Sequence, residues 1–159
     1  MTHDYKRHGT TTLFAALNIL EGTVIGSCLA RHRHQEFRKF LNVLDADTPS
    51  DVAVHAIVDN YATHKHPAIQ RWLQQHPRFH LHFIPTSASW LNLVEVWFAH
   101  MTTNQIRRCD FLGVRDPIDA IQAYIHNHNQ QAVPLIWTAP VERILEKIMK
   151  CRAVSESLH

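Results

Sequence analysis

Residues 52–59 read VAVHAIVD, an almost unbroken apolar run that is rich in valine and ends in an aspartate. Such a run is typical of a strand that is covered on both faces in an α/β sheet. Asp59 would then lie at the carboxyl end of the strand, where ligands and catalytic groups collect in open α/β sheets. The alternative is that Asp59-Asn60 only turns the chain, because both residue types are common turn formers.

Segments that read alternately as strand and helix flank this run. Strands are predicted over 11–19, 23–29, 52–58 and 79–84, the first two joined by a hairpin turn at Glu21-Gly22. Apolar spacing predicts helices over 34–44, from Pro67 to before His76-Pro77, from about Ser87 through Met101, over 116–128, and from 141 to about 153. The alternating order predicts a mixed α/β sheet with helices on its faces.

Composition indicates one ordinary domain that does not require a strongly charged partner. The chain has 159 residues, 45% of them apolar, and a formal charge of only +2. Its three cysteines, Cys28, Cys109 and Cys151, lack CxxC spacing, which favours a reducing compartment over a disulfide framework. With no signal-like start and no apolar run of about 18 residues, we expect a soluble cytoplasmic protein without a membrane partner.

Glu95 is the second candidate for chemistry, because it stands within a largely apolar helical run, LNLVEVWF at 91–98. Burial of an unpaired charge is costly, so the carboxylate either points at a cation or lies on a solvated flank of the helix. Asn92 stands three residues earlier, on the same helical face. A strand-end aspartate and a helix glutamate suit Mg²⁺, which favours few protein oxygens, several waters and substrate phosphates. The chemistry these residues predict is metal-dependent phosphoryl transfer.

The same segments resemble a known family. Residues 54–73 (VHAIVDNYATHKHPAIQRWL) and 82–98 (HFIPTSASWLNLVEVWF) are similar to the DDE endonuclease domain of bacterial insertion-sequence transposases allied to the mariner superfamily. The likeness extends to residues 2–19, 32–41 and 123–129, so it covers most of the chain.

The resemblance implies a ribonuclease-H-like (retroviral-integrase-like) α/β fold and a site of three carboxylates that holds Mg²⁺ or Mn²⁺. On this likeness, Asp59 matches the second carboxylate and Glu95 the third, while Asn60, Asn92 and His64 support them. Leu93 departs from the polar residue expected after that asparagine. The implied activity is cleavage of transposon ends and strand transfer into target DNA, by a homodimer or larger assembly in the bacterial cytoplasm and on the nucleoid.

The first carboxylate of the family is expected upstream of residue 2, on a central strand that this chain does not include. Asp4 is no substitute, because it stands in a polar stretch ahead of the hairpin. We therefore expect residues 1–159 to be a single partial catalytic domain with a helical tail from about residue 114, inactive in strand transfer by itself. Two alternatives remain: an inactive remnant that binds DNA or a full-length partner, and another ribonuclease-H-like nuclease acting on RNA in a hybrid duplex.

Basic and imidazole side chains supply further candidates. The histidine pairs lack the partners of a zinc finger, and His80 and His82 would share one wet face of a strand. His64 and Lys65 follow the Asp59 strand, so they would lie near substrate phosphates or in a solvated loop. Short basic groups could contact DNA phosphates or remain solvated surface: Lys6, Arg7, Arg31, Arg33, Arg107 and Arg108. Trp90 and Trp97 stand at helical spacing and are predicted to be core residues.

Overall fold

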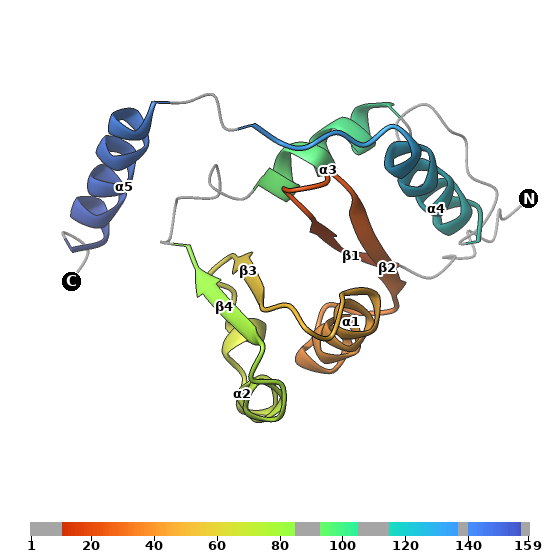
Figure 1. Cartoon of the computed structure of the whole chain (residues 1–159), viewed down its shortest axis with the longest axis horizontal. Coiled ribbons are helices and arrows are strands. Elements are labelled where there is room, and N and C mark those ends of the chain that lie inside the picture. Colours follow the sequence, from red (N-terminus) through yellow and green to blue (C-terminus); the bar gives the residue numbers. More distant parts are fainter. Residues whose placement is uncertain (1–10, 85–92, 105–114, 137–139, 157–159) are drawn as a thin grey trace, which may run out of the picture.

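A computed structural model describes residues 11–84, 93–104, 115–136 and 140–156 (Figure 1). The elements follow in the order β1 (Thr12–Leu17), β2 (Val24–Leu29), α1 (His34–Asp47), β3 (Val54–Val58), the 3₁₀ helix η1 (Ala62–Lys65), α2 (Pro67–Gln75), β4 (Phe79–Phe83), α3 (Leu93–Asn104), α4 (Arg115–Gln130) and α5 (Val141–Glu156). Among them, no helix is both long and apolar enough to cross a lipid bilayer.

β1 and β2 form the hairpin that the sequence predicts. They pair antiparallel from Thr12 opposite Leu29 to Leu17 opposite Val24. The connection closes with a hydrogen bond from the Gly22 N–H to the Asn18 carbonyl at 2.7 Å. Gly22 has a φ of 75°, a left-handed conformation that glycine adopts without the steric cost of a Cβ.

β3 and β4 form a second, parallel pair, from Val54 opposite Phe79 to Val58 opposite Phe83. The crossover between them runs through η1 and α2, because parallel neighbours cannot be joined by a tight turn. The described strands therefore make two sheets of two strands each, in place of the one mixed sheet that the sequence predicts. The mixed α/β character is confirmed, whereas a continuous sheet is not seen among the described residues.

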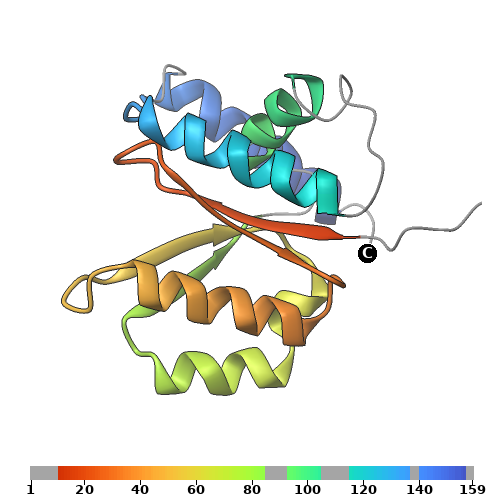
Figure 2. The same ribbon diagram turned by 90° about the vertical axis from the view of Figure 1, so that its right-hand side faces the viewer.

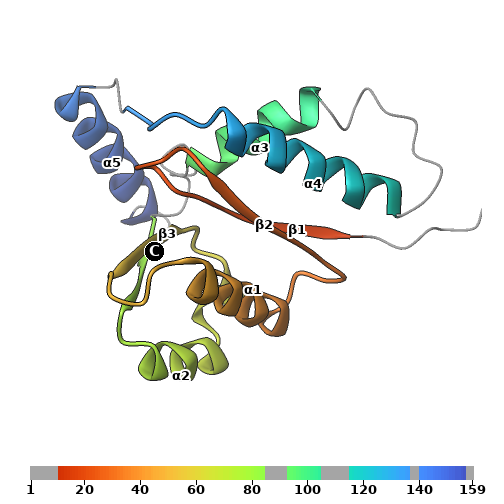
Figure 3. The same cartoon turned by 45° about the vertical axis from the view of Figure 1, so that its right-hand side comes forward.

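One hydrophobic core is shared by the two sheets. It joins Phe14 of β1 to the inner faces of α1 and α2 and to Phe79 of β4, through Phe37, Phe40, Leu41, Leu44, Ile69 and Trp72. In Figures 1 and 3, α1 lies next to both the β1–β2 hairpin and the β3–β4 pair. Trp72 is further fixed by a 2.7 Å hydrogen bond from its Nε1 to Asn42 Oδ1 of α1.

A second core lies on the opposite face of the β1–β2 hairpin. Val24 packs there with Trp97 and Met101 of α3 and Ile121 of α4. Because side chains alternate along a strand, the hairpin presents Phe14 to one core and Leu13 and Leu17 to the other. Figure 2 shows the resulting three layers, with α1 on one side of the hairpin and α3 and α4 on the other.

The β3–β4 pair is covered on one face only within the described residues. Val54 and Leu81 pack against the shared core, but His55, His80 and His82 are exposed and Ile57 is 55% exposed. The expectation that residues 52–58 form a strand covered on both faces is therefore wrong for this side. No described helix lies over it in the way that α3 and α4 lie over the hairpin.

Candidate active site at the end of β3

Asp59 directly follows β3 and precedes η1, which carries the buried imidazole of His64. His64 of η1 is 8% exposed, and its ring lies 4.3 Å from that of Phe37 on α1. The backbone N–H of His64 donates a hydrogen bond to the Tyr61 carbonyl at 3.0 Å, which closes the single turn of η1. The core therefore holds His64 directly against the strand end.

The His64 ring fixes the backbone of Asp59. Nδ1 lies 3.2 Å from the Asp59 carbonyl oxygen, to which it donates, and 2.9 Å from Oδ1 of the carboxylate. The shorter distance is an electrostatic contact only, because Oδ1 receives no hydrogen bond from any described group. Oδ1 is thus buried without a donor, although the Asp59 side chain as a whole is 49% exposed.

A half-exposed carboxylate with one unsatisfied oxygen fits a divalent cation. A buried oxygen that lacks a hydrogen bond raises the free energy of the fold, and a bound cation would remove that cost. Mg²⁺ binds one or two carboxylates and completes its shell with water and phosphate, which the exposed side of Asp59 permits. Asn60 is exposed beside it.

Glu95 lies in the first turn of the described part of α3 and is exposed. This exposure agrees with the alternative of a solvated helix flank, because the buried side chains of α3, Trp97 and Met101, pack on the side that faces β1–β2. No hydrogen bond or ion pair joins Glu95 to Asp59 in the described parts of the chain. Nor do three His, Cys, Asp or Glu residues there stand close enough to hold a metal together.

Exposed cations lie on the segments around Asp59. Lys65 of η1 holds its ammonium 5.0 Å from the centre of the Phe83 ring, at the carboxyl end of β4. Arg31 and Arg33 are exposed on the connection from β2 to α1. Arg33 is paired with Glu36 at 2.8 Å, and this contact lowers the pKa of the Glu36 carboxyl to about 2. Lys65 and Arg31 are therefore better placed than Arg33 to neutralise phosphate.

Two stacked imidazoles beside this site were not predicted from the sequence. His32 stacks on Phe14 at 4.8 Å, and His34 stacks on His66 at 3.6 Å. Desolvation first, and then the nearby charges of His66 and Arg33, lower the pKa of His34. The alternation His-Arg-His at 32–34 was visible, but the stacking depends on Phe14 of β1 and on His66 between η1 and α2, which are distant in sequence.

Other predicted site residues fall outside the described residues: Asn92, Lys6, Arg7, Arg107 and Arg108. The same holds for Asp4, for Trp90 and for the predicted helix start near Ser87.

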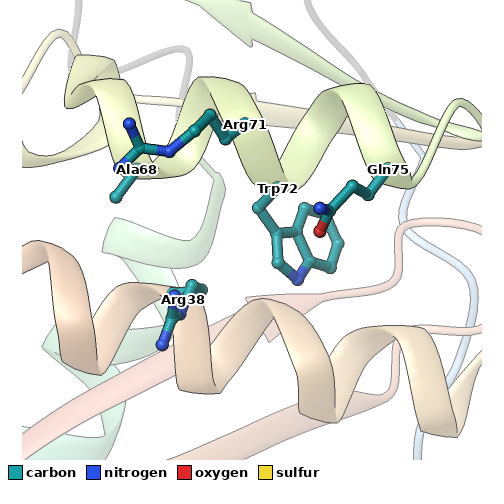
Figure 4. Close-up of a pocket in the computed structure, with 5 residues that line it drawn as sticks. All are labelled: Arg38, Ala68, Arg71, Trp72 and Gln75. Atoms are coloured by element: carbon teal, nitrogen blue, oxygen red, sulfur yellow. The ribbon is translucent and has the colours of Figure 1, made fainter.

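A hollow between α1 and α2 is a poorer candidate for this chemistry. It is lined by Arg38, Ala68, Arg71, Trp72 and Gln75 (Figure 4). It offers two guanidinium groups and one amide but no carboxylate, so its lining suits an anion and not Mg²⁺.

Comparison with known proteins supports an assignment for the chain. The sequence profile of the DDE superfamily endonuclease family matches residues 2–112. A curated relative, the "Insertion element IS630 uncharacterized 39 kDa protein" of Shigella sonnei, is 35% identical over 75 residues. That alignment covers 46% of this chain but only 22% of the relative, so the match spans less than a quarter of that protein.

Proposed function

The chain belongs to the DDE superfamily of endonucleases, and from this membership we propose that it is part of the catalytic domain of an insertion-sequence transposase. Asp59 and Glu95 are its second and third metal-binding carboxylates. The relative encoded by an insertion element supports this choice over a nuclease that acts on RNA hybrids. The substrate is DNA, as transposon ends and then as target, and the working form is a homodimer or larger assembly.

The observation that carries the proposal is the state of Asp59. Its Oδ1 is buried and accepts no hydrogen bond from the described residues, although His64 Nδ1 lies 2.9 Å away, and its backbone carbonyl accepts a hydrogen bond from that buried ring. A turn-forming aspartate would ordinarily bond to nearby backbone N–H groups. An oxygen left unsatisfied on a rigid strand end is instead suited to a ligand.

The residues of the site have separate roles. Asp59 supplies the carboxylate oxygen on the fixed strand end, and Glu95 supplies a second carboxylate from α3. Lys65 and Arg31 bind the phosphate backbone of the DNA next to them. When bound there, Mg²⁺ or Mn²⁺ would lower the pKa of an attacking water and stabilise charge on the leaving oxygen.

We further propose that α3 approaches β3 when the first carboxylate is present. In the three-carboxylate site that the family implies, that carboxylate would lie on a strand next to β3. Such a strand would bring a third oxygen to the carboxyl end of β3, where Asp59 lies. The exposed position of Glu95 is compatible with a ligand that completes its site only with this additional part.

The decisive experiment compares cleavage of DNA carrying the element's ends by this chain and by the chain extended upstream, with Mg²⁺ or Mn²⁺. We expect activity only in the extended protein, lost in Asp59→Asn and in Glu95→Gln but retained in Asp51→Asn, an exposed carboxylate in the turn before β3. Activity unchanged in Asp59→Asn would refute the assignment. DNA binding without cleavage in either protein would instead identify an inactive remnant.

Metal binding can be tested without catalysis. In the chain alone, Mn²⁺ should broaden NMR signals around Asp59 and His64, and Asp59→Asn should abolish that broadening. Asp51→Asn is again the matched control. Broadening that survives in Asp59→Asn would place the ion elsewhere.

A further inference from the structure

Three imidazoles lie together on the open face of the β3–β4 pair. His55 Nδ1 is 3.0 Å from His82 Nε2, and the ring of His55 stacks on His80 at 4.7 Å between centroids. All three side chains are exposed. The group belongs to neither hydrophobic core, and it is not part of the carboxylate site.

The strand register brings these rings together. His55 is paired directly with His80, and Ile57 with His82, so His55 and His82 are diagonal neighbours across the two strands. Alternation along each strand directs all three to the same side, away from α1 and α2. Because hydrogen bonds of the parallel pair fix the register, the backbone keeps His55 and His82 neighbours on this face.

The separation of the two nitrogens suits adjacent ligands of one metal ion. Nitrogens bound at about 2.1 Å to a common ion lie about 3.0 Å apart at a 90° angle and about 3.4 Å apart at the tetrahedral angle. The observed 3.0 Å is an ordinary N···N hydrogen-bond length, and it also places the two nitrogens at the separation that neighbouring positions of a square-planar or octahedral ion require. Imidazole nitrogens suit Cu²⁺ and Ni²⁺, which adopt those geometries.

We propose that His55 Nδ1 and His82 Nε2 form a two-imidazole binding site for Cu²⁺ or Ni²⁺, with water in the remaining positions. Without metal, one ring donates an N–H hydrogen bond to the other, and metal binding requires the donor ring in its other tautomer, with its proton on the nitrogen that does not face the ion. Since no three His, Cys, Asp or Glu residues in the described part of the chain could hold a metal jointly, the site has two protein ligands. His80 orients His55 by stacking.

This site is distinct from the one proposed for Asp59 in the ligands it offers. Its donors are two nitrogens, whereas Mg²⁺ requires oxygen ligands. An ion held between His55 and His82 would link the two strands non-covalently, and it would stabilise the folded chain by a free energy that rises with the logarithm of the ion concentration once this exceeds the Kd.

The test is a titration of the untagged 159-residue chain with Ni²⁺, followed by calorimetry and by thermal unfolding. We expect His55→Asn and His82→Asn each to weaken one class of sites at least about tenfold, since even loss of a residue that only supports a ligand weakens metal binding by about 10–100-fold. His126→Asn is the control, because His126 is exposed on α4 and contacts Gln130, not a second imidazole. Ni²⁺ should raise the Tm of the wild type and of this control but not of the strand variants, and Mg²⁺ should raise none.

A measurement on the wild type guards against misfolded variants. Paramagnetic Ni²⁺ or Cu²⁺ should broaden NMR signals of residues around 55 and 82 first as the ion is added. Broadening that begins elsewhere, or identical titrations in all four proteins, would overturn the proposal. Neither outcome would bear on Asp59, because that site is tested with Mn²⁺ and DNA.

Discussion

Arg78 ties the end of α1 to the start of the β3–β4 pair. Its Nε and Nη2 donate to Asp45 Oδ1 at 3.0 and 2.7 Å, and Nη2 also donates to the Asp45 carbonyl at 2.8 Å. Its Nη1 donates to the carbonyls of Pro49 at 2.7 Å and Val52 at 3.2 Å. One side chain thus satisfies acceptors across the turn that leads into β3.

Replacement of Arg78 by methionine should destabilise the chain by about 2–3 kcal/mol. Removal of one partner from a buried ion pair costs about 3–5 kcal/mol. Here the Arg78 side chain is 18% exposed and that of Asp45 is 34% exposed, so water can partly satisfy the carboxylate that remains. The expected cost is therefore below the buried range, and it corresponds to a fall in Tm of about 4–12 °C for a chain of this size.

The assay is urea unfolding followed by circular dichroism and tryptophan fluorescence, with Arg78→Lys and Arg71→Met beside Arg78→Met. Lysine keeps the charge but not the planar fork, so it should retain only part of the stability. Arg71 is exposed on α2, and its replacement should change stability by less than about 0.5 kcal/mol. If the free energy of unfolding of Arg78→Met differs from that of the wild type by less than this same amount, the turn does not depend on these hydrogen bonds.

Three further changes test other contacts. Gly22→Ala should destabilise the hairpin by at least about 1 kcal/mol in thermal unfolding, because φ is 75° and an added Cβ would collide with the backbone oxygen of Val133; an unchanged Tm would show that the turn can relax. Trp72→Phe loses the hydrogen bond to Asn42 and should lower the free energy of unfolding by about 1–3 kcal/mol. A double-mutant cycle with Asn42→Ala isolates that hydrogen bond, and a coupling energy near zero would show that it does not stabilise the fold. The hydrogen bond from Arg33 lowers the pKa of Glu36 from 4.5 to about 2. The ionised Glu36 therefore stabilises the folded chain fully above pH about 4.5, and this contribution is lost as the pH falls to about 2. NMR titration should show this pKa rising in Arg33→Gln; an unaltered value would exclude Arg33 as the cause.

Local signals in the sequence were sufficient for most elements of the fold. Glu21-Gly22 predicted the hairpin turn because glycine tolerates the positive φ found there. Pro67 and His76-Pro77 predicted both ends of α2, which runs Pro67–Gln75, since proline suits the first turn of a helix and ends one that precedes it. Each of these signals acts within a few residues, so it survives without knowledge of the rest of the chain.

Features that depend on distant segments could not be predicted. The run at 52–58 is apolar throughout, and its periodicity does not reveal that no described helix covers His55 and Ile57. Arg78 reads as ordinary surface, yet it bonds to residues about thirty positions earlier. Asp59 and His64 were predicted as site residues, but the unsatisfied oxygen depends on how Phe37 of α1 packs His64 into place.

The core shared by Phe14, α1 and Phe79 joins two sheets that have no strand pairing between them among the described residues. Neither strand pair can withdraw from α1 without exposing apolar surface that also stabilises the other. Amide protons of β1 and β3 should therefore exchange with solvent at similar rates, as members of one cooperative unit. A disturbance in the hairpin would reach the strand that ends in Asp59 through side-chain packing and not through the backbone.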